Sequence, residues 1–357
     1  MLDLSGQTPL SVRIGPDGPR LRWRMDKKII ETTFDRFRPM QLLVHDGETP
    51  RVVWRDLKDI PLNLPFFFES VKVVQQAKGV AGLFQTDVEV VKQVAAQPGG
   101  LAFSGAMFHM ARTGSTLVHR LLSASGKVHS LSEAPIFNLA LAQGSKLPKG
   151  AQAPVIRALL GAYARPRRPT DQHMVIKMQD VPSRELPTFR EAFPETPWIF
   201  IYRDPVEVMV SLIRKPTGTM QQWYHNRARI AKTLEMPGLA DGSLSPPDYA
   251  ARTLRKFCEA AVEAAKVAPK GNFLAINYRR LPEAVWETIG PHFGIEFTGK
   301  EIDEMREAAK YSSKEGGAKE FKSDVKGKHD EAGPRVRMLA DKLIAPVLRQ
   351  IEELPQG

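Results

Sequence analysis

The stretch from Leu101 to Leu122 constrains the fold more than any other part of this 357-residue chain. A mostly apolar run up to Met110 is followed by a short polar turn and then by an amphipathic segment. This order predicts a buried strand, a tight turn and a helix with one apolar face. The backbone N–H groups at the start of such a helix, together with its dipole, attract an anion. The stretch therefore predicts a binding site for phosphate or a group shaped like it.

The turn itself is Arg112-Thr113-Gly114-Ser115-Thr116. Gly114 lets the backbone approach a ligand, Ser115 and Thr116 add hydroxyl donors, and Arg112 adds a fixed charge. A Walker A loop is excluded, because that motif requires Lys directly after its last glycine, where this chain has Ser115. The alternative interpretation is an ordinary strand–turn–helix whose polar residues only cap the helix.

Composition narrows the class of protein. Apolar residues make up 42% of the chain and charged residues 25%, as in an ordinary soluble protein. No apolar run reaches the roughly 18 residues of a membrane span. Cys258 is the single cysteine, so no intramolecular disulfide is expected. The N-terminal sequence MLDLSGQTPLSVRIG lacks a basic start and an apolar core, so no signal peptide is expected. These features predict a cytoplasmic protein.

The net charge of +11 has three interpretations: nucleic-acid binding, general solubility, or a site for a polyanionic small molecule. Basic residues are scattered, apart from a small cluster at Arg165, Arg167 and Arg168 and a Lys-rich stretch from Lys314 to Lys328. No stripe of aromatic and basic residues and no zinc-finger spacing accompanies them. Nucleic acid is therefore not the expected partner.

Charged residues stand at the ends of three later predicted strands. Glu133 follows the second strand, Lys177 ends the third, and Arg203 follows the fourth. In an open α/β sheet, ligands bind at the carboxyl ends of the strands. A buried ammonium there requires an anionic partner. A surface carboxylate for Glu133 and a structural salt bridge for Lys177 remain the alternatives.

Several of these segments together resemble the sulfotransferases that use 3′-phosphoadenosine 5′-phosphosulfate (PAPS). The turn at 112–116 resembles their 5′-phosphosulfate loop. Residues 202–211, with Arg203-Asp204-Pro205 and then Ser211, resemble their 3′-phosphate motif, and 175–180 resemble their lysine-bearing strand end. The pair at 132–133 is similar to the Ser-Glu-Pro segment of the branch with bacterial and Golgi-type enzymes, although Ala134 interrupts it here. The resemblance covers about residues 100 to 330.

The resemblance implies an α/β fold with a P-loop-type parallel sheet flanked by helices. It implies transfer of the sulfuryl group from PAPS to a hydroxyl or amine acceptor, with release of PAP. The implied cofactor-binding residues are Arg112, Thr113, Gly114, Ser115, Thr116, Arg203 and Ser211. Arg112 and Lys177 would stabilise the leaving phosphate, and Glu133 is the candidate base. No metal is required, because Arg and Lys neutralise the charge.

Three histidines compete with Glu133 for the role of base: His109, His119 and His129. His109 precedes the turn, His119 is expected to point away from it, and His129 lies inside the second strand. Glu133 is therefore preferred.

The chain is predicted to consist of an N-terminal extension, residues 1–98, and a sulfotransferase-like domain, residues 99–357. The extension shows two hairpin patterns, around residues 15–18 and 46–48, followed by a helical texture over 64–97. The run 66–68, three phenylalanines, is expected to be a core anchor. A basic loop at about 312–328 is expected to close over the nucleotide, or else to be a solvated loop.

Two other functions remain open: a P-loop kinase, and a non-catalytic nucleotide-binding module on the same fold. The acceptor is equally open, since carbohydrate, lipid, peptide and small metabolites are all compatible with the residues. Oligomeric state is not specified by the sequence.

Overall fold

The computed structural model of the chain describes residues 12–15, 18–21, 34, 36–45, 48–57, 62, 64, 66–78, 83–143, 147, 150–180, 185–217, 228, 231, 236–311 and 325–357. The strands are β1 (Val12–Gly15), β2 (Gly18–Leu21), β3 (Phe37–Leu43), β4 (Arg51–Asp56), β5 (Leu83–Asp87), β6 (Ala102–His109), β7 (Val128–Ser132), β8 (His173–Lys177), β9 (Trp198–Tyr202) and β10 (Phe273–Asn277).

The helices of the first two hundred residues are α2 (Phe67–Lys78), α3 (Val88–Ala95), α4 (Ser115–Ala124), α5 (Pro135–Gln143), α6 (Gln152–Tyr163) and α7 (Leu186–Ala192). Those that follow are α8 (Pro205–Arg214), α11 (Pro237–Ala240), α12 (Pro246–Lys266), η3 (Tyr278–Arg280), η4 (Val285–Ile289), α13 (Gly290–His292), α14 (Gly299–Ala309), α15 (Val325–Glu331), α16 (Pro334–Leu339), η5 (Ala340–Ile344) and α17 (Ala345–Glu352).

The centre of the molecule is a parallel sheet of five strands in the order β10-β9-β6-β8-β7. Since every neighbouring pair is parallel, all five carboxyl ends lie at one edge of the sheet. The predicted fold class, a parallel α/β sheet flanked by helices, is confirmed. β8 and β9 have the bounds that their apolar runs predict.

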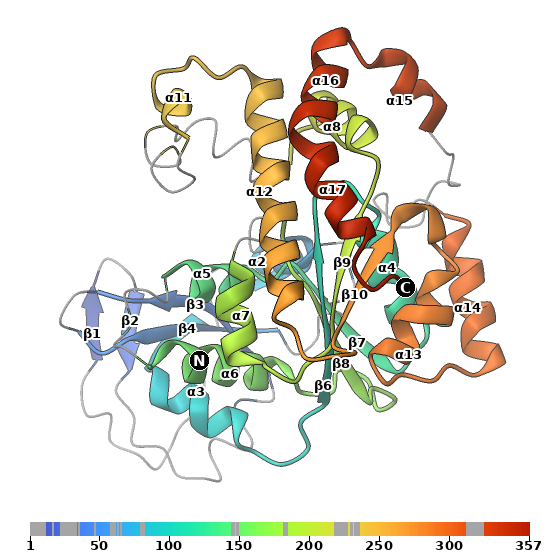
Figure 1. Cartoon of the computed structure of the whole chain (residues 1–357). Coiled ribbons are helices and arrows are strands. Elements are labelled where there is room, and N and C mark those ends of the chain that lie inside the picture. Colours follow the sequence, from blue (N-terminus) through green and yellow to red (C-terminus); the bar gives the residue numbers. More distant parts are fainter. Residues whose placement is uncertain are drawn as a thin grey trace.

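The side chains of the parallel sheet alternate between two apolar layers. In β9, Trp198 and Phe200 belong to one core cluster, whereas Ile199 and Ile201 belong to the other. Helices α4 and α14 and segment η4 cover the second layer, and α7 and α12 lie on the opposite side of the sheet (Figure 1). Both faces of the strands are therefore buried, which explains their nearly continuous apolar sequences.

The N-terminal extension contains a second sheet, in the order β1-β2-β5-β4-β3. The two predicted hairpins are confirmed, because β1 pairs with β2 and β3 with β4, both antiparallel. The prediction of a wholly helical segment over 64–97 is wrong, since β5 lies between α2 and α3 and pairs with β2 and β4. Both pairings join residues distant in sequence, so a local pattern does not show them.

This second sheet packs on the helices of the parallel sheet. The Tyr163 hydroxyl in α6 donates to the Pro39 carbonyl over 2.6 Å, and the Arg167 guanidinium donates to the Leu57 carbonyl. Phe67 is buried against Tyr163, so it is a core anchor as predicted. That prediction is wrong for Phe68, whose side chain is 48% exposed.

The predicted division at residue 98 stays a prediction. Residues 312–324, most of the basic loop expected to close over the nucleotide, lie outside the described residues, and α15 forms the end of that stretch. Among the helices that the structure describes, none combines the length and the apolar character needed to cross a bilayer.

Candidate active site

The predicted anion-binding turn lies at the carboxyl end of β6, between that strand and α4. Its backbone departs from the usual conformations, since Ala111 has φ 70° and Arg112 has φ 54°. Glu133, after β7, has φ 57°. Among the described residues other than glycine, these three alone have positive φ, and strain of this kind gathers at functional sites.

Gly114 is required by the geometry of the turn. Its φ is 81°, and a Cβ atom there would lie 2.9 Å from a Leu281 methyl and 3.0 Å from the Tyr278 ring. Its carbonyl accepts the N–H groups of Leu117 (2.8 Å) and Val118 (3.2 Å), which begins α4. A glycine therefore lets the turn after β10 pack directly on the anion-binding turn.

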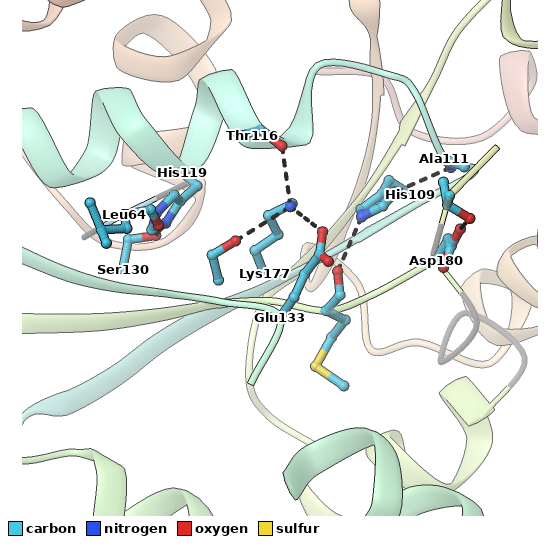
Figure 2. A network of polar contacts seen from close by, with 12 residues as sticks. Leu64, His109, Ala111, Thr116, His119, Ser130, Glu133, Lys177 and Asp180 are labelled. Carbon is cyan, nitrogen blue, oxygen red and sulfur yellow. Dashed lines mark hydrogen bonds and ion pairs between the residues drawn. The ribbon is translucent and has the colours of Figure 1, made fainter. Parts of the chain in front are cut away.

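Lys177 and Glu133 form an ion pair at the ends of β8 and β7 (Figure 2). The Lys177 ammonium also donates to Thr116 Oγ1 over 3.3 Å and to Ser132 Oγ over 3.4 Å. Lys177 is 1% exposed, whereas the Glu133 side chain is 19% exposed. The anionic partner predicted for Lys177 is therefore Glu133, and the ammonium links that carboxylate to the helix of the anion-binding turn.

The two anion motifs, about a hundred residues apart in sequence, meet in space. Arg112 Nε donates to Ser211 Oγ, in α8, over 2.8 Å. Arg203, which follows β9, donates from Nη1 to the Arg112 carbonyl at 3.5 Å. Two guanidinium groups and a hydroxyl therefore converge beside the start of α4.

Arg203 is held on two sides. Its Nε donates to Glu207 Oε2 over 2.6 Å, one turn along α8, and its guanidinium carbon lies 3.9 Å from the centre of the Tyr278 ring. Asp204 caps the same helix by accepting the Glu207 N–H over 3.0 Å. Arg203 and Glu207 are both buried, so the charge of each requires the other.

The C-terminal helices reach this pair. His329 Nε2, in α15, lies 3.7 Å from Asp204 Oδ1 and 3.7 Å from Glu207 Oε1. Asp204, Glu207 and His329 are the residues, in the described part of the chain, whose ligand atoms lie close enough together to hold a metal ion. Arg203 already binds Glu207 there, so the group is explained as part of an ion-pair network.

The two histidines nearest the pair have both ring nitrogens engaged (Figure 2). His109 Nδ1 accepts the Ala111 N–H over 3.1 Å, so Nε2 carries the proton and donates to the Met178 carbonyl over 3.1 Å. His119 Nε2 donates to the Leu64 carbonyl over 3.2 Å, and Nδ1 lies 2.8 Å from Ser130 Oγ. His129 is buried inside β7, as predicted. This geometry favours Glu133 over the histidines as the base.

Acid is expected to unfold the protein through two buried histidines. Burial lowers the pKa of both His119 and His129 from 6.5 to about 3, with Lys177 adding to the effect at His119. The unfolded chain therefore binds more protons between pH 6.5 and 3, and the free energy of unfolding should fall as pH drops through this window. The expected loss is about 1 kcal/mol per pH unit for each histidine, measured by urea unfolding at pH 7 and pH 5.

The control variant is His119→Gln, because the amide can replace both hydrogen bonds but does not titrate in this range. Its loss of stability between pH 7 and pH 5 should be clearly smaller than that of the unchanged protein. Equal losses in the two proteins would show that His119 is not responsible.

Three residues at the site were missed by sequence reasoning. Phe66 places its ring 5.1 Å from the Lys177 ammonium, Tyr278 lies against Arg203, and Glu207 pairs with it. A signal existed for Glu207, since Arg203 and Glu207 are four residues apart at the start of a predicted helix. No local signal places Phe66 beside Lys177 or Tyr278 beside Arg203, because the two residues of each contact are far apart in the sequence.

Comparison with known proteins identifies the family of this chain. The sequence model of the sulfotransferase family matches residues 108–299, which is more than half of the chain and contains every site residue that the sequence predicted. A comparison with curated proteins found no match.

Solved sulfotransferase structures also align with the chain. Sulfotransferase STF9 from Mycobacterium avium is 14% identical, with a TM-score of 0.41, and the alignment covers 67% of this chain and 76% of that one. A sulfotransferase from Alicyclobacillus acidocaldarius is 12% identical, with a TM-score of 0.39 and coverage of 70% and 94%. The sulfotransferase domain of the curacin biosynthetic pathway is 13% identical, with a TM-score of 0.37 and coverage of 71% and 98%. The assignment is based on the family model: the chain belongs to the sulfotransferase family.

Proposed function

We propose that this protein transfers the sulfuryl group of PAPS to a hydroxyl or amine acceptor and releases PAP. The observation that supports this most is the hydrogen bond between Arg112 and Ser211, with Arg203 on the Arg112 carbonyl. It joins the turn that resembles a 5′-phosphosulfate loop to the motif that resembles a 3′-phosphate site. A donor with anionic groups at both positions suits such a pair better than a nucleotide with 5′-phosphates alone.

The hydrogen-bond donors of the anion-binding turn are suited to binding PAPS. The Thr113 hydroxyl is fully buried and has no hydrogen-bond partner among the described residues, and a phosphate oxygen is the acceptor that we propose for it. Ser115 and Thr116 begin α4, where the N–H groups and the helix dipole favour an anion. Arg203 and Ser211 would hold the 3′-phosphate, which distinguishes PAPS from ATP.

The other roles in the reaction are filled by residues of this chain. PAPS supplies the sulfuryl group when bound. The Glu133 carboxylate accepts the proton of the acceptor hydroxyl as the hydroxyl oxygen attacks the sulfur of the sulfuryl group. Lys177 holds that carboxylate beside Thr116 and so fixes the distance between the base and the anion-binding turn. Arg112 neutralises charge on the leaving phosphate.

Thermal unfolding with added nucleotides tests the donor. PAP at saturation should raise Tm by several degrees without magnesium, because a ligand that binds only the folded state stabilises it. ATP and ADP, each with and without magnesium, are the comparison. A response confined to ATP with magnesium would favour the kinase alternative, and no response to any nucleotide would contradict a nucleotide site.

A further inference from the structure

We propose that Phe66 and Phe68 form one wall of the acceptor site and select an acceptor whose hydroxyl is carried on an aromatic body. The proposal depends on the proposed function, since it takes Glu133 as the group that receives the acceptor proton. It assigns a role to the N-terminal extension, which the sequence left without one.

Phe66 adjoins the proposed reacting group. Its ring centre is 5.1 Å from the Lys177 ammonium, and that ammonium is bonded to the Glu133 carboxylate. An acceptor oxygen that donates its proton to Glu133 therefore lies within one side-chain length of the Phe66 ring. We therefore place the part of the acceptor that carries this oxygen beside the Phe66 ring.

The two rings extend from the site toward solvent. Phe66 and Phe68 are stacked, with ring centres 5.6 Å apart and planes 23° from parallel. Phe67 points the other way into the core, and Phe68 is left 48% exposed. The Lys72 ammonium lies 5.2 Å from the centre of the Phe68 ring. Stacked rings of this kind are a surface for another flat apolar group.

The position of this wall relative to the anion-binding turn is set by a part-buried hydrogen bond. His119, in the helix that begins at the turn, donates to the Leu64 carbonyl, two residues before Phe66. The Phe66 carbonyl in turn accepts the Glu69 N–H over 3.0 Å at the start of α2. The rings therefore have a defined place beside the Lys177–Glu133 pair, as preorganised recognition requires.

The binding of two sulfate esters to the PAP-saturated protein tests the aromatic wall, and this test does not require the natural acceptor to be known. The probes are 2-naphthyl sulfate and glucose 6-sulfate, which carry the same charged group on an aromatic and on a polar body. Isothermal titration calorimetry measures their affinities and, separately, the affinity of PAP. 2-Naphthyl sulfate should bind at least about tenfold more tightly than glucose 6-sulfate, since an aromatic contact adds to burial of apolar area.

Variants Phe66→Leu and Phe68→Ala should each remove most of this preference and leave the affinities for PAP and glucose 6-sulfate within about twofold. The matched control is Phe297→Leu, because Lys127 lies over the Phe297 ring at 5.4 Å in the same kind of contact, at the amino end of β7. This variant should keep the preference.

Two negative results can be told apart. PAP binding with equal affinity for the two esters, or a preference unchanged in Phe66→Leu and Phe68→Ala, would overturn the aromatic wall and leave the donor site intact. Failure of the unchanged protein to bind PAP would contradict the proposed function itself and this proposal with it.

Discussion

Replacing Glu133 by Gln is expected to lower the rate of sulfuryl transfer by about two or more orders of magnitude, because an amide cannot accept the acceptor proton. The affinity for PAP should be nearly unchanged, since the turn and Arg203 are untouched. The substitution keeps the size of the side chain, and the amide oxygen can still accept a hydrogen bond from Lys177. PAP release under single-turnover conditions measures the rate, and calorimetry measures PAP binding.

The control for this variant is Glu195→Gln, an exposed carboxylate just before β9 and so at the opposite edge of the sheet. It should retain full activity. Full activity in Glu133→Gln would remove Glu133 from the mechanism, and loss of PAP binding in that variant would indicate a structural role for the carboxylate instead.

Replacing Arg203 by Met is expected to have two effects of different origin. The affinity for PAP should fall by about one to two orders of magnitude, because a hydrogen-bonded charge is worth about 1.5–3 kcal/mol. The free energy of unfolding should fall as well, by about 3–5 kcal/mol, because Glu207 is left as a buried carboxylate without its guanidinium partner. Calorimetry and urea unfolding measure the two effects separately.

The double variant Arg203→Met with Glu207→Gln separates them. Removing the carboxylate charge should restore most of the lost stability, whereas the affinity for PAP should stay low. His329, 3.7 Å from Glu207, is unchanged in both variants. Recovery of PAP affinity in the double variant would show that Arg203 acts only as the partner of Glu207 and not as a 3′-phosphate ligand.

The parallel sheet could be predicted from the sequence because its signals are local. An apolar run of strand length between turn residues, as at 173–177 and 198–202, marks a strand buried on both faces wherever it lies. Once the strands are parallel, the charged residues that follow them must gather at one edge, so Glu133, Lys177 and Arg203 could be proposed together. β5 escaped prediction because it is stabilised by pairing with β2 and β4, which no local pattern contains.

The sequence by itself determined the strands of the parallel sheet along the chain, the anion-binding turn and the residue types that its chemistry needs. Only the tertiary structure decided which of those residues touch. The bond from Arg112 to Ser211, the Tyr278 ring beside Arg203 and the Phe66 ring beside Lys177 each join segments far apart in the chain. Such contacts depend on how the sheet twists and how its helices pack, because these set which side chains share a space.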